Sequence, residues 1–148
     1  MQRCFEYLDR SGVRYTRLDA PPARLAKTIV FVAGESYGIA VVPVDGYVNL
    51  EELKTILGAS RVRLASEKEL SDRFPECEVG AMPPFGELFD LTVYVDCGLA
   101  LEDFIAFYAG TKREVIQMTF ENFRRLAHPV IADLRRWGTK DCEPVSRG

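Results

Sequence analysis

The sequence predicts a single α+β domain over residues 1–148, in which a mixed, barrel-like β-sheet is flanked by helices. Short runs rich in β-branched and aromatic residues alternate with segments of helical periodicity. Several of these runs are joined by hairpin-like turns, which differs from the regular strand–helix alternation of parallel sheets. The length fits one domain, no linker or repeat divides the chain, and polar residues 138–148 are expected to form a frayed tail.

Capping residues set the ends of the expected helices. Gly12 is a natural C-terminal stop for the first helix. Asn49 caps the second helix, and Ser66 forms a capping box with Glu69 at the start of the third. Thr119 caps the last one. The expected helices therefore cover residues 2–11, 50–57, 67–74 and 120–127.

Strands are expected where β-branched and aromatic residues lie between turn residues. The turn Gly34-Glu-Ser makes the strands at 27–33 and 37–44 a hairpin, and Pro43 indicates that the second strand ends there or lies at an edge. Gly110 separates another pair of strands. The full expected set is 13–18, 27–33, 37–44, 62–65, 91–95, 104–109 and 114–118.

The composition is typical of a soluble globular protein, with 47% hydrophobic and 28% charged residues. No apolar run approaches the roughly 20 residues that span a bilayer. The first residues carry no apolar segment of the kind found in secretory signals. We therefore expect a cytoplasmic protein with no membrane partner.

Common catalytic and metal-binding motifs are missing from the sequence. Its four cysteines are scattered without a C-x-x-C pair, so the usual spacing of zinc ligands does not occur. Neither a Walker A motif nor G-x-G-x-x-G is present. A Ser-His-Asp or Cys-His catalyst would have to use His128, the only histidine, which is better explained as a surface or helix-end residue.

Charge is unevenly distributed along the chain. The formal net charge is −3, with +3 in residues 1–28, −9 in the middle and +3 in residues 112–148. The acidic total argues against binding to duplex DNA. The two basic ends either fold into a local patch, with Arg124-Arg125 and Arg135-Arg136 as candidates, or present these arginines as solvated helix faces.

Three segments carry residue types that a reaction can use. Gly80-Ala-Met-Pro-Pro-Phe-Gly86 brackets two prolines with two glycines, and the N–H groups of so rigid a loop can stabilise an oxyanion. Lys27 opens an apolar strand, and Asp96 closes another. Each also has an ordinary explanation, as a connecting loop, a solvated lysine or a turn-forming carboxylate.

The order of the motifs is more specific than any one of them. A-K-T-I-V-F is followed by Y-G-I-A-V-V-P-V, G-A-M-P-P-F-G, V-Y-V-D and Y-A-G-T-K-R-E-V, between about Leu25 and Leu134. This order resembles the YbaK/prolyl-tRNA synthetase-associated superfamily of aminoacyl-tRNA editing domains. The resemblance implies a deacylase that acts in trans on mischarged tRNA, at the ester of the 3′-terminal ribose, and needs no metal or organic cofactor.

The resemblance also assigns site residues. Lys27 matches the functional lysine of the family, and Gly80-x-x-x-Pro84 matches its G-x-x-x-P loop, so Lys27 and Gly80 are the expected catalytic residues. The expected substrate-binding residues are Ala81, Met82, Pro83, Pro84, Asp96 and Gly110. The expected partners are the 3′ end of mischarged tRNA and an aminoacyl-tRNA synthetase.

The chemistry explains these residue types. An aminoacyl ester is already activated, so the enzyme has to orient water and stabilise the tetrahedral oxyanion, which the N–H groups of residues 80–82 can do. Lys27 would hold the terminal phosphate or ribose. Asp96 would pair with the substrate α-ammonium group or orient Lys27, and the neighbouring ribose hydroxyl would help to activate the water.

One departure from the family leaves alternatives open. Relatives carry a further helix before the A-K-T strand, and here residues 15–26 cross that gap in very few residues. Its loss would open the pocket, alter selectivity or abolish activity, so a catalytically weak module that binds tRNA or a synthetase is the alternative. A hydrolase of small esters is a third. Met82 and Phe85 either narrow the pocket toward small side chains or face the core.

Overall fold

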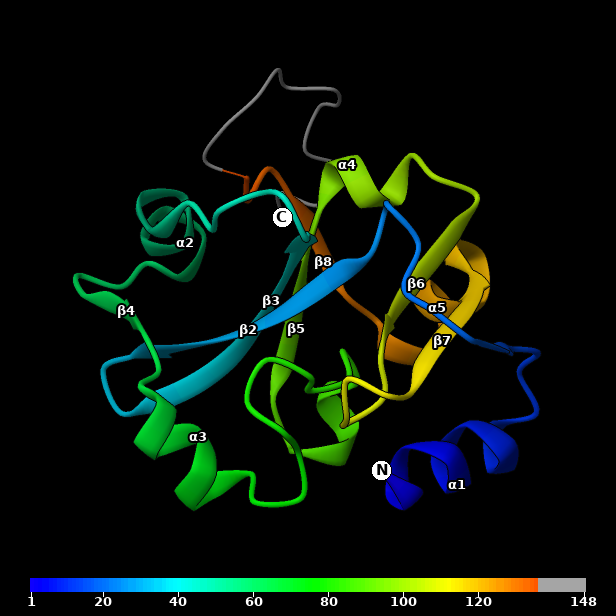
Figure 1. The fold of residues 1–148 in the computed structure, drawn as a ribbon. Helices are drawn as coiled ribbons and strands as arrows, with labels where there is room; N and C mark the ends of the chain where they lie inside the picture. The colour runs from blue at the N-terminus through cyan, green and yellow to red at the C-terminus, as the bar shows by residue number, and fades with distance from the viewer. Residues whose placement is uncertain (136–148) are drawn as a thin grey trace.

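The computed structural model describes residues 1–135, so Arg136 and the expected tail at 138–148 lie outside the described residues. Figure 1 shows the fold. Its helices are α1 (Gln2–Ser11), α2 (Leu50–Leu57), α3 (Glu67–Arg73), α4 (Cys97–Ala100), α5 (Phe120–Ala127) and a 3-10 turn, η1 (Gly86–Leu88). Its strands are β1 (Thr16–Leu18), β2 (Ala26–Ala33), β3 (Ser36–Pro43), β4 (Val62–Leu64), β5 (Thr92–Asp96), β6 (Phe104–Tyr108), β7 (Val115–Thr119) and β8 (Val130–Ala132).

The strands form two sheets. The larger has the order β4-β2-β3-β5-β8 and is mixed, because β2 pairs antiparallel with β3 and β4 while β5 pairs parallel with β3 and β8. The smaller is antiparallel, in the order β1-β7-β6. The predicted α+β class with a mixed sheet and flanking helices is confirmed. Among residues 1–135, one bridge, between Leu25 and Ala106, joins the sheets, which do not close into a barrel.

Local signals placed most elements correctly. The hairpin of β2 and β3 turns at Gly34, which has the positive φ of 64° that this tight turn requires. The Asn49 side chain accepts the N–H of Glu52, and Ser66 and Glu69 form the expected capping box. These caps fix α2 and α3 because they satisfy N–H groups that have no partner inside the helix.

Three short elements lie outside the predicted set: η1, α4 and β8. Each has three or four residues, too few to show a periodic pattern. Their conformation depends on tertiary contacts, since β8 exists by pairing in parallel with β5 and α4 is capped by Asp96. The expected strand at 13–18 shortens to Thr16–Leu18, which pairs only with β7 at the edge of the smaller sheet.

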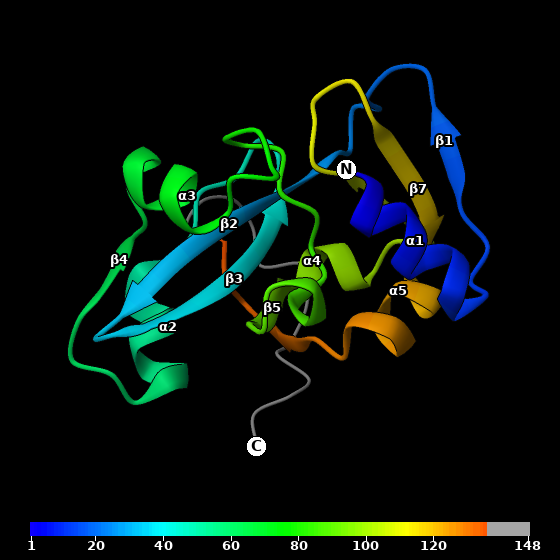
Figure 2. The same cartoon turned by 90° about the horizontal axis from the view of Figure 1, so that it is seen from below.

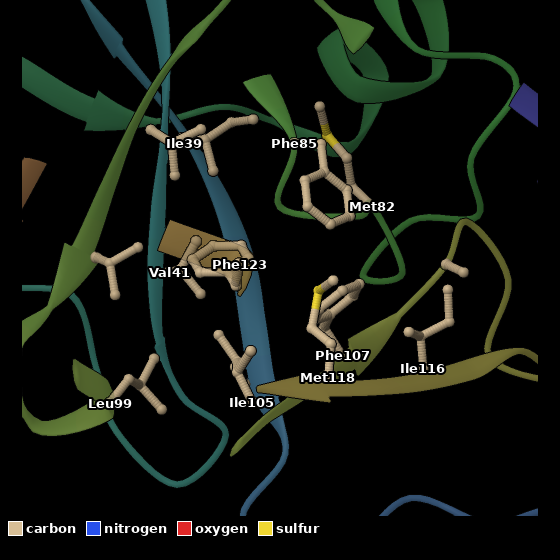
Figure 3. Close-up of a cluster of buried hydrophobic side chains, with 14 of the residues drawn as sticks. Ile39, Val41, Met82, Phe85, Leu99, Ile105, Phe107, Ile116, Met118 and Phe123 are labelled. Carbon is tan, nitrogen blue, oxygen red and sulfur yellow. The ribbon is translucent and has the colours of Figure 1, made fainter. Parts of the chain in front are cut away.

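The main core lies between the sheets and under α1 and α5, and Figure 3 shows a cluster of its side chains. At its centre the rings of Phe85, Phe107 and Phe123 pack with centroids 5.3 to 6.2 Å apart. Phe85 is fully buried there, so it faces the core, which is one of the two alternatives that the sequence left open. Burying each of these rings contributes about 1.5–3 kcal/mol to the stability of the fold.

A second core covers the opposite face of the larger sheet. Leu53 of α2 packs there with Phe31 of β2 and Val42 of β3. Figure 2 shows α2 and α3 on either side of the β2–β3 hairpin. Strand β2 therefore has two distinct faces, one toward α3 and the main core and one toward α2. Within residues 1–135, none of the helices combines the length and the apolar composition needed to cross a membrane.

Candidate functional site

A cavity of about 200 Å³ lies where β2, the junction of β4 with α3, and the loop after α3 come together. Its lining includes two polar side chains, Thr28 and Glu78, and the backbone of Gly80. The rest of the lining is apolar and comprises Ile29, Val30, Leu64, Ala65, Leu70, Phe74, Cys77, Val79 and Met82. Two residues of the predicted glycine- and proline-containing loop, Gly80 and Met82, thus border one hollow in the surface.

The turn after β6 holds this loop in place. The Gly110 N–H donates to the Ala81 carbonyl at 2.7 Å, and the Glu78 N–H donates to the Gly110 carbonyl at 2.8 Å. Gly110 has φ 105°, and a Cβ on it would overlap the Met1 side chain. Because of these constraints only glycine fits at position 110, and it acts by supporting the loop rather than by lining the cavity.

The loop presents backbone donors at the edge of the cavity. The Ala81 N–H is used internally, since it donates to the Glu78 carbonyl at 3.0 Å. Across residues 1–135, no protein acceptor takes the N–H groups of Gly80 and Met82. Pro83 and Pro84, both buried, have no N–H and stiffen the second half of the loop. The two unused donors belong to residues that line the cavity, and backbone N–H groups stabilise a developing oxyanion where they point at it.

Thr28 faces this cavity and Lys27 does not. Thr28 pairs across the hairpin with Val41 of the main core, whereas Lys27 pairs with Val42 of the second core. Because residues paired across strands share a face, the two neighbours point in opposite directions. The Lys27 ammonium lies 5.4 Å from the ring centroid of Tyr47, a side chain that is 61% exposed. The expected catalytic lysine is therefore not among the residues that surround the cavity.

The Thr28 hydroxyl is the unusual polar group of the cavity. Thr28 is 8% exposed, and its Oγ1 has no hydrogen-bond partner among the described residues. A buried hydroxyl without a partner costs about 1–3 kcal/mol. Thr28 lines the cavity while its Oγ1 is itself covered, so the side chain has to turn for the hydroxyl to reach a polar atom of a ligand.

Asp96 lies away from the cavity and is bound by the backbone. Its Oδ1 accepts the N–H groups of Leu134 and Arg135 at 2.9 and 3.1 Å, and its Oδ2 accepts that of Gly98 at 3.1 Å. Arg135 also lies 3.9 Å from the carboxylate. Burial raises the pKa of Asp96, and these donors oppose the rise. Asp96 does not line the cavity beside Gly80. It pairs with Ala132 of the second core, so it lies on the face of the larger sheet that also carries Lys27.

A candidate metal-ligand cluster includes the same carboxylate. Asp96, Cys97 and Asp133 place ligand atoms within 4.8 Å of one another. Both carboxylate oxygens of Asp96 already accept backbone N–H groups. These bonds give Asp96 a structural role, which is to join α4 to the segment after β8.

Two charged residues, Glu78 and Lys112, lie beside the loop at Gly80. The Glu78 carboxylate accepts the N–H of Lys112 at 3.1 Å. The Lys112 ammonium lies 3.7 Å from the position that a Cβ on Gly80 would take. One negative and one positive side chain thus stand beside the loop. No sequence pattern pairs these two residues, because they are 34 positions apart.

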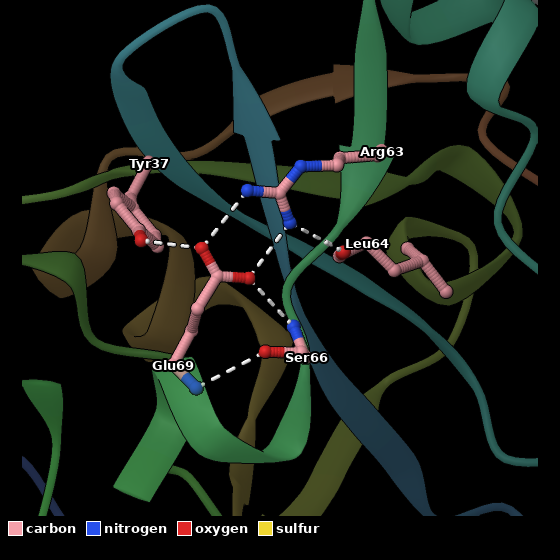
Figure 4. A network of polar contacts seen from close by, with 5 residues as sticks. All are labelled: Tyr37, Arg63, Leu64, Ser66 and Glu69. Atoms are coloured by element: carbon pink, nitrogen blue, oxygen red, sulfur yellow. Dashed lines mark hydrogen bonds and ion pairs between the residues drawn. The ribbon is translucent and has the colours of Figure 1, made fainter. Parts of the chain in front are cut away.

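A hydrogen-bonded network fixes the wall formed by β4 and α3 (Figure 4). Arg63 donates to both carboxylate oxygens of Glu69 at 2.7 and 2.9 Å, and the Tyr37 hydroxyl donates to the same group at 2.9 Å. The Arg63 guanidinium, first among these donors, holds the pKa of Glu69 well below its usual range. The network ties α3 to the hairpin and keeps the neighbouring cavity residues Leu64 and Ala65 in place.

Sequence comparisons place the chain among editing domains. Residues 14–126 match the family described as the aminoacyl-tRNA editing domain. The proline–tRNA ligase of Bacillus cytotoxicus is 36% identical over 83 residues, and that of Bacillus cereus strain AH187 is 32% identical over 83 residues. Each match covers 56% of this chain and 14% of the ligase, so the chain spans a small part of these relatives.

Solved structures share the fold. A protein proposed as a trans-editing enzyme for prolyl-tRNA synthetase has a TM-score of 0.78 and 20% identity, over 92% of this chain and 96% of its own. A hypothetical protein has a TM-score of 0.80 and 19% identity, over 89% of this chain and 98% of its own. At these identities the likeness shows the fold alone. Together with the family match, it confirms the resemblance that the order of motifs predicted.

Proposed function

The chain belongs to the aminoacyl-tRNA editing domain family, and from this premise we propose that it is a deacylase that hydrolyses mischarged tRNA in trans. The observation that supports the proposal most directly is the arrangement of polar groups in the cavity lining. Gly80 and Met82, whose N–H groups have no protein acceptor among residues 1–135, line the same cavity as Thr28, whose buried hydroxyl has no partner among those residues. The site has donors for an oxyanion and room for an amino-acid side chain.

The proposed reaction adds water to the ester carbon. The carbonyl oxygen becomes an oxyanion that accepts hydrogen bonds from Gly80 and Met82, and one such donor is typically worth about 10²–10³ in kcat. Collapse of the intermediate breaks the bond to the ribose oxygen, which takes a proton. The products are the free amino acid and a tRNA with both ribose hydroxyls. No step uses a metal.

The remaining polar groups are assigned to binding. Thr28 hydrogen-bonds a polar atom of the aminoacyl group, which relieves its buried, unpaired state. Glu78 lines the cavity, where a carboxylate attracts the α-ammonium group, and Lys112 attracts a phosphate of the tRNA end. In this assignment Ala81, Pro83 and Pro84 shape the loop.

Lys27 is assigned a contact outside the cavity. Its ammonium and the exposed ring of Tyr47 form a cation-and-aromatic pair, the combination that binds phosphate and stacks on an unpaired base. We propose that this pair touches the tRNA beyond the scissile ester. Gly110 and Asp96 support the fold around the site from a distance.

The proposal extends to partners and location. Because the relatives in the comparison are proline–tRNA ligases, tRNA(Pro) is the first tRNA to test and a synthetase is the second expected partner. Such a protein acts where tRNA is charged, in the cytoplasm.

The test is deacylation of a panel of mischarged tRNAs by the wild-type protein and by Thr28→Val. Thr92→Val is the matched control, since Thr92 is an exposed strand residue outside the cavity. We expect wild type and control to release the amino acid equally and Thr28→Val to be at least several-fold slower. Equal rates for all three proteins would remove Thr28 from the site.

The catalytically weak binding module is the second candidate, favoured by one observation. Within the described residues the structure has no helix between β1 and β2. The site therefore lacks the wall that this helix is expected to form in relatives. Stable association with tRNA, without hydrolysis of any member of the panel, would favour this candidate over the deacylase.

A further inference from the structure

The size of the cavity limits which aminoacyl group fills it. Its volume is about 200 Å³. An apolar cavity of about 150 Å³ is large enough to bind benzene. The methyl group of alanine would leave most of the space beside Thr28 empty. A larger apolar side chain would bury more apolar surface in this cavity and would therefore bind more tightly.

The walls of the cavity are apolar on three sides. Val30 comes from β2, Leu70 and Phe74 from α3 and its end, and Val79 and Met82 from the loop. The unpartnered Oγ1 of Thr28 is the buried polar atom among them. A serine or threonine hydroxyl would find one partner among these walls, the Thr28 hydroxyl, and would otherwise lose its water against apolar side chains, which disfavours it.

The walls are also fixed in position. The Ala65 N–H donates to the Val30 carbonyl at 2.9 Å, which joins two walls directly. The bonds from Arg63 to Glu69 and the capping box hold the start of α3. A preorganised cavity of this kind does not shrink around a small ligand, so unfilled volume translates into lost affinity.

From the volume and the lining we propose that the site selects an aminoacyl group with a branched aliphatic side chain, of the size of valine or leucine, over alanine and serine. This inference rests on the proposed function. The ester lies at Gly80 and Met82, and the side chain points toward Val30 and Phe74. One methylene more or less in a hydrophobic pocket changes affinity about tenfold or more.

The probes are adenosines that carry the amino acid through a stable amide at the 3′ position, so binding is measured without hydrolysis. Alanyl, seryl, valyl and leucyl derivatives are titrated into the wild-type protein by calorimetry. We expect valyl or leucyl to bind at least about tenfold more tightly than alanyl, and seryl to bind no better than alanyl.

A variant sharpens the test. Ala65→Leu adds volume inside the cavity, and Ala20→Leu adds the same volume at an exposed position as the control. We expect Ala65→Leu to remove the preference for valyl and leucyl, and Ala20→Leu to keep it. Circular dichroism verifies folding, and the wild-type series decides the question if Ala65→Leu does not fold.

The outcomes separate this inference from the proposed function. Equal or tighter binding of the alanyl or seryl derivative would overturn the selection of branched side chains, while hydrolysis of mischarged tRNA would still support the deacylase. Hydrolysis of tRNA without binding of any derivative would show that the aminoacyl group does not occupy the cavity. Neither binding nor hydrolysis would overturn both.

Discussion

The two faces of strand β2 differ in almost every property that matters for a site. On one face Thr28 and Val30 border a cavity, beside a loop with two unused N–H groups. On the other, Phe31 is packed under α2 and Lys27 lies next to an exposed Tyr47. The A-K-T motif is one unit in the sequence, but the alternation of a strand splits it. Adjacent residues of a motif therefore need not act on the same atoms of a substrate.

The largest effect should come from the loop on the cavity face. Gly80 has φ 87°, so Gly80→Ala strains the backbone and shifts the donors. We expect kcat for deacylation to fall about 100-fold, the scale for a lost oxyanion donor. Gly34→Ala is the control, because Gly34 has φ 64° with nothing within 4 Å and lies in the hairpin turn. Single-turnover rates and melting temperatures are measured for both variants, which separates the effect of backbone strain on stability from its effect on catalysis. Equal losses of rate in Gly80→Ala and Gly34→Ala would contradict the assignment of the Gly80 loop to the reaction.

The next effect concerns the hydroxyl of Thr28, where stability and activity should move in opposite directions. Thr28→Val removes a buried group that has no partner among the described residues, so the free energy of unfolding should rise by about 1 kcal/mol. The same change should lower kcat/KM about tenfold. Urea unfolding and deacylation assays on one preparation measure both. Lower stability together with lower activity would indicate a hydroxyl that serves the fold.

Because Lys27 lies on the opposite face of β2, its substitution should weaken the binding of tRNA without slowing the cleavage of the ester. If it touches the tRNA outside the cavity, Lys27→Ala should raise KM for aminoacyl-tRNA about three- to tenfold and reduce the salt dependence of binding by about one phosphate contact. It should not slow the cleavage of an aminoacyl-adenosine that lacks the rest of the tRNA. Lys68→Ala, at an exposed position of α3, is the control. A large loss of rate on the adenosine ester would place Lys27 at the reaction after all.

The smallest effect is a pH dependence of stability that comes from Glu69, on the cavity side of β2. The pKa of Glu69 is lowered chiefly by Arg63, so this carboxylate stabilises the fold above its unfolded pKa of about 4.3. That stabilisation is lost as the pH falls below about 4 toward the lower pKa of the folded state. The difference in melting temperature between wild type and Glu69→Gln should therefore shrink between about pH 5 and pH 2. Glu51→Gln, on α2, is the control, and its melting temperature should differ less from that of wild type. A difference for Glu69→Gln that stays constant with pH would contradict the pairing of Glu69 with Arg63.

Much of the fold could be predicted because its signals are local. The Asn49 cap, the Ser66–Glu69 capping box and the Gly34 turn each act within a few residues, and each element they predicted is present. The resemblance named the loop at Gly80, and the structure places Gly80 and Met82 at a cavity. The sequence does not show which residues far apart along the chain lie close together in the fold. Glu78 and Lys112 meet only because two loops pack together, and β8 forms only by pairing with β5.

The expected roles of Lys27 and Asp96 illustrate the same limit for the site. The order of motifs groups Lys27 with Gly80, although the alternation of a regular strand places Lys27 and Thr28 on opposite faces. Asp96 ends a strand, a position that can place a charge at the rim of a pocket. Its oxygens instead accept three backbone N–H groups from α4 and from the segment after β8, contacts that no sequence pattern indicates.

The measurement that tests the central claim most directly is the rate of hydrolysis of one aminoacyl-adenosine ester by wild type, Thr28→Val and Lys27→Ala. The ester lacks the body of the tRNA, so it reports only on the cavity. We predict hydrolysis by wild type, a loss of about tenfold in Thr28→Val and an unchanged rate in Lys27→Ala. An unchanged rate in Thr28→Val with a large loss in Lys27→Ala would show that the reaction takes place on the other face of β2.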